Sequence, residues 1–284
     1  MARRRIAIFG GGIAGLTLAC ALDPHRFDVT LYEAQPERSE SGSALGLWGA
    51  ARHALHDVGA LPTLGERPTQ GALHRIDGRR LLPLRGGGPL MVERPALLSA
   101  LERAVPRKVH REQLEVTDPS TLQAGLIVGA DGVRSRVRGL IEPVAAERLA
   151  TPYLALRGIA PNPPEPSTVG EYWGGGLLFG IVPTSGGKTY WFSTHRSELR
   201  EPLDLRAALT ETRHQFRAAA PTVRQLLLDA GGETLATRLW VAPPMRSTCA
   251  TVMWSSAMPH TRCCRIWAGA RVAQSSTRLR WPPR

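Results

Sequence analysis

Lysine, cysteine and long apolar stretches are all scarce in this chain of 284 residues. Only Lys108 and Lys188 are lysines among 36 basic residues, which is typical of a gene from a GC-rich genome. The four cysteines have no Cys-x-x-Cys spacing and no metal-binding spacing with histidine, so we expect neither a metal site nor a disulfide framework. No run of about 18 apolar residues occurs, so we expect no helix that spans a membrane.

The start of the chain and its charge suggest where the protein acts. Residues 1–5 run directly into an apolar segment and leave no room for a secretory signal, so we expect a cytoplasmic protein. The net charge is +12, but residues 246–284 contribute seven arginines and no acidic residue. The preceding part has no basic helix and no stripe of interleaved aromatic and basic residues. We therefore expect no nucleic-acid partner.

A Gly-x-Gly-x-x-Gly motif follows the apolar segment Ile6–Phe9. Gly10 permits a tight turn after a strand, Gly12 leaves room for a pyrophosphate, and Gly15 lets the next helix pack closely. A helix that starts here directs unpaired N–H groups and its positive dipole end towards the phosphates. Glu33 lies 18 residues after Gly15, at the end of a second predicted strand, where a carboxylate can bind a ribose hydroxyl. The alternative is a glycine-rich surface turn with a solvated glutamate.

The order of the predicted elements indicates an α/β fold, with a Rossmann-like FAD-binding domain and a second, smaller sheet-containing domain. Asp77-Gly78 separates two strand-like runs and predicts a hairpin over residues 74–84. Residues 36–43 are polar and precede the next apolar segment. The other predicted strands lie at 28–32, 126–132 (with its turn), 153–158, 176–182 and 189–194, and the predicted helices lie at 16–22, 50–58, 96–105, 205–219 and 223–230.

Two further motifs accompany the glycine motif and its acidic residue. They are Glu93-Arg94 followed by Leu97, and Val128-Gly129-Ala130-Asp131-Gly132-Val133-Arg134-Ser135. Together the three features resemble the FAD-dependent aromatic-ring monooxygenases that are built like 4-hydroxybenzoate hydroxylase. The segments 156–158 and 170–180 are similar to the urate-hydroxylase and zeaxanthin-epoxidase-like branch. The resemblance covers residues 5–245.

This resemblance implies cofactor-binding roles for six residues. Gly10, Gly12 and Gly15 would hold the FAD pyrophosphate, Glu33 the adenosine ribose, and Arg94 the phosphate and ribityl region. Asp131 would serve a motif that the family uses for both FAD and NAD(P)H. From the residues alone, the alternative for Asp131-Gly132 is a simple turn, and the alternative for Arg94 is a surface position at a helix N-terminus.

Four tryptophan and phenylalanine residues need separate interpretations. We expect Trp173, Phe179 and Trp191 to pack in the core rather than contact substrate. Trp48 begins the run Trp48-Gly49-Ala50-Ala51, where the family usually has Pro-Asn-Ala, so the resemblance does not predict the flavin-side contact of that Asn here. The residues point to no catalytic side chain and no metal ligand.

The implied reaction is the family's. NAD(P)H reduces bound FAD as a transient co-substrate, and oxygen then hydroxylates or epoxidises a small aromatic or unsaturated substrate. We expect a discontinuous FAD-binding domain at 1–70 plus 93–150, and a substrate domain at 71–92 plus 151–245. A flavin-dependent dehydrogenase or reductase is one alternative, and a non-catalytic remnant of a flavoprotein is another.

Residues 246–284 do not continue the resemblance. The family's Gly-Asp-Ala-Ala-His motif is absent after Pro244. Back-translation of residues 256–272 with GC-rich codons, read from the third base, gives Gly-Asp-Ala-Ala-His-Ala-Met-Leu-Pro-Asn-Leu-Gly-Arg-Gly-Ala-Cys. We infer a frameshift near Arg246, with a divergent natural tail as the alternative. Because the tail has no apolar face of helical or strand period, we expect it to be disordered and the chain to be impaired in flavin binding.

Overall fold

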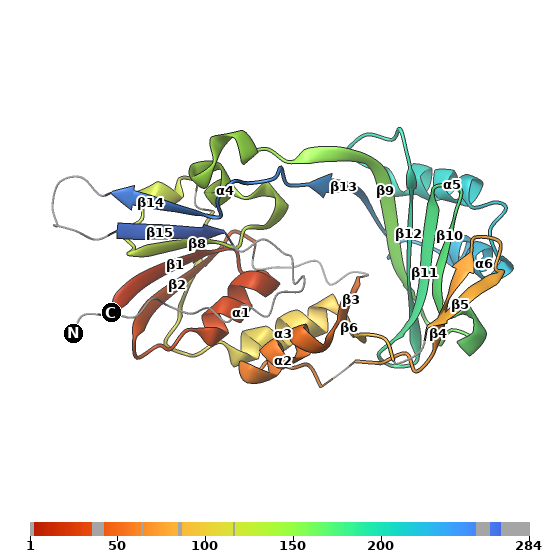
Figure 1. Cartoon of the computed structure of the whole chain (residues 1–284), viewed down its shortest axis with the longest axis horizontal. Coiled ribbons are helices and arrows are strands. Elements are labelled where there is room, and N and C mark those ends of the chain that lie inside the picture. Colours follow the sequence, from red (N-terminus) through yellow and green to blue (C-terminus); the bar gives the residue numbers. More distant parts are fainter. Residues whose placement is uncertain are drawn as a thin grey trace.

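Two sheets, each covered by helices, form the two halves of the molecule (Figure 1). The computed structural model describes residues 3–35, 43–63, 65–84, 87–115, 117–253 and 262–267, with the backbone alone described for 249–253 and 262–267. Most of the polar stretch 36–43 and most of the tail lie outside these residues. Among the described residues, no helix combines the length and apolar character needed to cross a membrane.

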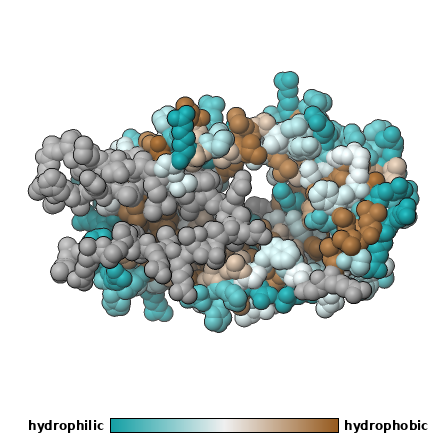
Figure 2. Space-filling view, viewed as in Figure 1, coloured by the Kyte–Doolittle hydropathy of each residue, from teal (hydrophilic) through white to brown (hydrophobic). Residues whose placement is uncertain are grey.

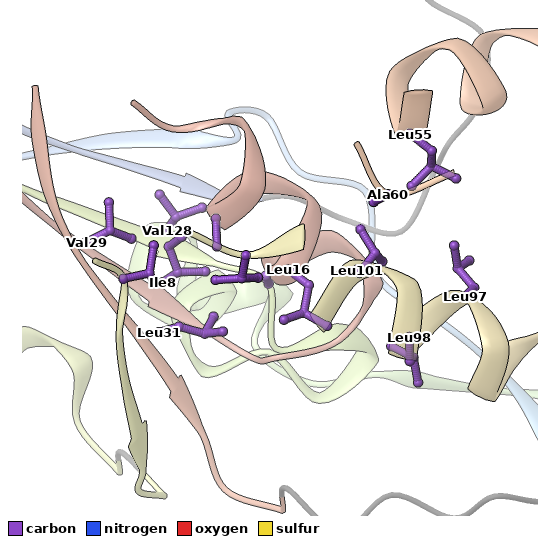
Figure 3. Packing of buried hydrophobic residues seen from close by; sticks show 14 of the residues in the cluster. Ile8, Leu16, Val29, Leu31, Leu55, Ala60, Leu97, Leu98, Leu101 and Val128 are labelled. Carbon is purple, nitrogen blue, oxygen red and sulfur yellow. The ribbon is translucent and has the colours of Figure 1, made fainter. Parts of the chain in front are cut away.

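The first half is built on a six-stranded sheet in the order β14-β15-β8-β1-β2-β7. Its strands are β1 (Arg4–Phe9), β2 (Phe27–Glu33), β7 (His110–Gln113), β8 (Leu126–Gly129), β14 (Cys249–Met253) and β15 (Arg262–Trp267). All neighbouring pairs are parallel except β14 with β15. Apolar side chains from this sheet, including Ile8 and Val29, pack against Leu16 of α1 (Ile13–Ala21) and Leu101 of α3 (Arg94–Ala104) (Figure 3). The predicted strand–turn–helix–strand unit at the start of the chain is confirmed.

The two tail strands differ from our expectation that residues 246–284 lack regular structure. β15 pairs in parallel with β8, from Cys264 opposite Leu126 to Trp267 opposite Gly129, and β14 pairs with β15. The physical reason is that β8 would otherwise be an edge strand. Its free N–H and C=O groups can pair with any extended segment, whatever side chains that segment carries.

A short two-stranded sheet connects the two halves. It consists of β3 (Ala44–Leu47) and β6 (Leu90–Glu93), and we call it the ribbon. α2 (Gly49–Asp57) follows β3, and α3 follows β6 directly, with Pro95 in its first turn as predicted. The ribbon packs against the second half through Ala44, Met91 and Tyr190.

The second half is a seven-stranded sheet in the order β13-β9-β12-β11-β10-β4-β5. Its strands are β4 (Gly71–Arg75), β5 (Arg80–Leu84), β9 (Leu149–Ala160), β10 (Gly170–Gly174), β11 (Leu177–Thr184), β12 (Lys188–Arg196) and β13 (Leu235–Val241). Only β10 with β4 is parallel. One face is covered by α5 (Leu205–Gln215) and α6 (Pro221–Asp229), and the other faces the ribbon (Figure 1). The predicted hairpin is confirmed as β4–β5, with Gly78 at a φ of +97° in its turn.

Side chains alternate between the two faces of β9, and one contact illustrates the alternation. Leu156 lies on the helix-covered face, and so does Gly158, which is opposite Trp191 of β12. A Cβ atom at position 158 would come within 2.7 Å of the Trp191 indole, so the ring occupies space that only glycine leaves. Arg157, between them, points to the ribbon-facing side.

Candidate cofactor and substrate site

The glycine turn between β1 and α1 leaves an open space at the helix N-terminus. Gly10 has a φ of +95°, and a Cβ there would collide with the Ala130 carbonyl. Gly15 packs against the Gly10 carbonyl so closely that a side chain would not fit. Around the Cβ position of Gly12, by contrast, no atom lies within 4 Å. Gly10 and Gly15 therefore shape the turn, while Gly12 leaves open space beside the free N–H groups that begin α1.

Glu33 ends β2 next to this turn. Its Oε2 atom accepts a hydrogen bond of 2.6 Å from the Gly11 backbone N–H, and its Oε1 accepts one of 2.8 Å from Gln35. The carboxylate is half-buried. A small hollow of about 210 Å³ lies beside it, lined also by Arg111 and Gln113 of β7. A half-buried acid at the carboxyl end of the second strand is suitably placed for a ribose hydroxyl.

Asp131 follows β8 and completes the same edge of the sheet. The backbone joins the two loops, because Ala130 donates a 2.7 Å hydrogen bond to the Phe9 carbonyl. The Asp131 Oδ2 atom accepts a hydrogen bond of 2.7 Å from the Arg136 N–H at the start of α4 (Arg136–Ile141). Its Oδ1 atom is buried and has no partner among the described residues. An unpaired buried carboxylate oxygen is costly unless a ligand provides the missing donor.

Arg138 holds the Asp131 loop in place, a role the sequence did not suggest. It is fully buried in α4, and its guanidinium donates to the backbone carbonyls of Ala145 at 2.6 Å and Val133 at 2.7 Å. A third bond reaches Ala146 at 3.1 Å. Arg138 lies three residues beyond Ser135, where the predicted Asp131-Gly132 motif ends.

The structure brings five of the six predicted cofactor residues together. Gly10, Gly12 and Gly15 line the turn, with Glu33 on one side and Asp131 on the other. Arg94 stands apart at the first position of α3, where its N–H donates to Ser43. The Arg94 side chain is exposed and has no polar partner among the described residues.

These residues fit the adenosine and pyrophosphate portion of a dinucleotide. Open space at a helix N-terminus, an adjacent half-buried carboxylate and an unpaired buried oxygen are the features that such a ligand requires. The two tail strands extend the sheet beside β8. No side chain described in the tail contacts the place where the flavin end would lie.

A cavity of about 630 Å³ lies between the ribbon and the seven-stranded sheet. Trp48, Gly46 and Met91 line it from the ribbon side, and Arg157 and Tyr190 line it from the sheet. Trp48 is 66% exposed at the start of α2, as befits a residue at the mouth of a cavity rather than in a core. In the space-filling view the two halves are separated by an opening near the middle of the molecule (Figure 2).

Two polar side chains distinguish the sheet wall of this cavity. Arg157 is half-buried, and its Nη1 donates to the Thr237 hydroxyl at 3.0 Å. Burial raises the pKa of Tyr190, and the nearby Arg157 guanidinium offsets part of this rise. Among the described residues the Tyr190 hydroxyl has no hydrogen-bond partner. The same wall also carries the Glu171 carboxylate, which accepts a hydrogen bond of 2.9 Å from the Trp173 indole N–H.

The expected roles of the aromatic residues hold for two of three. Phe179 and Trp191 are buried on the helix-covered face and stack at a centroid distance of 5.7 Å, as core residues do. Trp173 is half exposed, and its indole N–H donates to Glu171 at 2.9 Å, so it is not a core residue. Neither Arg157 nor Tyr190 was assigned a role from the sequence.

Comparison with known proteins supports the resemblance seen in the sequence. The NAD(P)-binding Rossmann-like domain family matches residues 8–44. The aurachin C monooxygenase/isomerase of Stigmatella aurantiaca is 28% identical over 216 residues, covering 66% of this chain and 56% of that protein. The FAD-dependent monooxygenase esdpE of Penicillium shearii is 28% identical over 236 residues, covering 68% of this chain and 49% of that protein. The chain is thus similar in sequence to monooxygenases, including one that is FAD-dependent.

Solved structures agree on the fold. The Klebsiella pneumoniae protein HpxO, solved with FAD and uric acid, superposes with a TM-score of 0.71 at 19% identity, covering 85% of this chain and 69% of that one. The shared architecture is the parallel Rossmann-like sheet with a separate second sheet. The chain spans about half the length of the curated relatives it matches.

Proposed function

We propose that the protein is an FAD- and NAD(P)H-dependent monooxygenase that hydroxylates or epoxidises a small aromatic or unsaturated substrate. The observation that carries the proposal is the meeting of the glycine turn, Glu33 and Asp131 at one sheet edge. The homology to FAD-dependent monooxygenases supports it. In this proposal the FAD-binding domain comprises residues 1–70 plus 93–150, and the substrate domain comprises 71–92 plus 151–245.

In the proposed reaction the residues of this chain bind and orient the cofactor and the substrate. The N–H groups at the start of α1 hold the pyrophosphate beside Gly12, and Glu33 accepts a hydrogen bond from the ribose. Asp131 offers its unpaired oxygen to a donor of the cofactor, and Arg94 serves the phosphate and ribityl region. Bound FAD supplies the redox chemistry with oxygen. The apolar walls of the cavity exclude water from the substrate.

One other catalytic function is an alternative to this one. A flavin-dependent dehydrogenase or reductase would use the same dinucleotide site without transferring oxygen. The test is to reconstitute a purified protein made from the restored reading frame with FAD, record flavin absorbance after gel filtration, and follow NADPH and NADH oxidation with product analysis. Bound flavin and an oxygenated product support the proposal. Bound flavin with NAD(P)H oxidation and a reduced or dehydrogenated product supports the alternative.

We further propose that this chain binds the flavin weakly, because a frameshift near codon 246 has replaced the original reading frame of a flavoprotein. The absence of the Gly-Asp-Ala-Ala-His motif, and its recovery when residues 256–272 are back-translated and read from the third base, support this. Sequencing the gene around codon 246 tests the idea directly. A protein made from the restored frame should retain FAD through gel filtration, whereas the 284-residue chain should lose it. Equal retention of FAD by both proteins would contradict the proposal.

A further inference from the structure

A second hollow adjoins the substrate cavity at the edge of the sheet. It has a volume of about 520 Å³ and shares Gln70, Gly71 and Leu84 with the cavity. Its other lining residues include Leu81 and Arg80 of the edge strand β5. The space available for a ligand therefore extends beyond the cavity, out to the rim of the molecule.

The cavity is also long in one direction. Its lining residues come from six consecutive strands of the sheet, β9, β12, β11, β10, β4 and β5. Neighbouring strands lie about 4.8 Å apart, so the path along the sheet from Arg157 to Leu84 covers roughly 24 Å. This is much longer than a single aromatic ring.

The two ends of this path differ in polarity. Arg157 is the only cationic side chain and Glu171 the only anionic one among the described lining residues of the cavity, and the Tyr190 hydroxyl lies near Arg157. At the opposite end Leu81 and Leu84 of the edge strand are 53% and 50% exposed, beside the exposed Arg80 that also lines the second hollow. Apolar side chains gathered at the rim of a cavity are typical of a surface that binds an apolar ligand.

We propose that this site takes an elongated amphiphilic substrate, with an anionic oxygen at Arg157 and an aliphatic chain that runs towards Leu84 and Leu81. The anionic oxygen is a carboxylate or an ionised hydroxyl, because both accept charge-assisted hydrogen bonds from a guanidinium. Val182 and Phe192 line the cavity between the two ends and provide an apolar floor. The proposal rests on the proposed function in taking this cavity as the substrate site.

The test measures binding without flavin. The purified 284-residue chain is titrated by calorimetry with a series of 4-alkylbenzoates, from methyl to octyl. Each added methylene should tighten binding by about fourfold while the chain still reaches new apolar surface. Arg157→Gln should weaken binding of every member by about tenfold or more, since a charge-assisted hydrogen bond is lost.

Leu84→Ser should flatten the chain-length dependence for the longer members and leave 4-methylbenzoate unaffected. Leu228→Ser is the matched control, because Leu228 is an exposed leucine on α6 that does not line the cavity, and it should change nothing. Circular dichroism spectra of all variants should match that of the parent chain.

Two results would overturn the proposal. An affinity that does not change with chain length refutes the aliphatic end, and an Arg157→Gln variant that binds like the parent refutes the anionic end. Failure of the proposed function would be seen separately, as lack of FAD binding by the protein made from the restored reading frame.

Discussion

The Glu33 carboxylate and the Gly11 backbone N–H are joined by a 2.6 Å hydrogen bond, the shortest link between β2 and the glycine turn among those described here. Residue 33 is thus tied to the turn before any nucleotide is bound. A ribose hydroxyl that enters beside Glu33 meets a carboxylate that is already oriented, so little conformational entropy is lost on binding.

Replacing Glu33 should weaken the binding of FAD. In Glu33→Ala the lost charge-assisted hydrogen bond is worth roughly 1.5–3 kcal/mol, or about one to two decades in Kd. Flavin fluorescence titration of the protein with the restored frame measures this. Glu147→Ala is the matched control, because Glu147 is an exposed glutamate away from the turn, and its Kd should equal that of the parent.

Asp131 has two separable roles, one in folding and one in binding. Asp131→Ala removes the acceptor for the Arg136 N–H and should cost about 1 kcal/mol of folding free energy. Asp131→Asn keeps an oxygen at this position, so it should preserve most of that stability while weakening FAD binding by about tenfold or more. Urea unfolding and flavin titration of both variants separate the two effects. An Asp131→Asn variant with parental affinity would show that the carboxylate does not contact the cofactor.

Arg138 should matter more for stability than any exposed arginine. Arg138→Met leaves the carbonyls of Ala145, Val133 and Ala146 without their donor inside the protein, and we expect a loss of about 3 kcal/mol or more. Chemical denaturation gives the free energy of unfolding. Arg196→Met, at an exposed arginine of β12, should change it by less than about 0.5 kcal/mol. A small effect at position 138 would mean that water replaces the guanidinium.

His195 should make the stability of the fold depend on pH. Burial lowers the pKa of His195 in the folded protein, and Glu211, 3.2 Å away, raises it only in part. The unfolded chain, with a histidine pKa of about 6.5, therefore takes up the proton first as the pH falls. The contribution of His195 to the free energy of unfolding is present above about pH 6.5 and is lost as the pH falls towards the pKa of His195 in the folded protein.

The magnitude of this loss is about 1.4 kcal/mol for each unit between the two pKa values. Urea unfolding at pH 8 and pH 5.5 should show a larger loss of free energy in the parent chain than in His195→Gln. His110→Gln, at an exposed histidine of β7, should keep the parental difference. Identical pH dependence in all three proteins would rule out the role of His195.

Local patterns predicted the backbone geometry of the proposed cofactor site. The glycine turn, Glu33 and Asp131 are specified by short spacings after apolar strands, and parallel strands bring their carboxyl ends to one edge. Arg157 and Tyr190 could not be found this way. Each is one residue in an alternating strand, and which face becomes the cavity depends on where α5, α6 and the ribbon pack. The pairing of β15 with β8 depends on backbone groups, so no side-chain pattern signals it.

The space that Gly158 leaves for Trp191 has a consequence on the opposite side of the sheet. A shift of β9 by one residue would turn Arg157 into the indole and expose Leu156 to the cavity. The contact between Trp191 and Gly158 thus fixes the register of β9. It also determines the direction of the Arg157 guanidinium, although it lies outside the cavity. Gly158→Ala should therefore change which ligands bind by shifting β9, although residue 158 is not one of the cavity's charged groups.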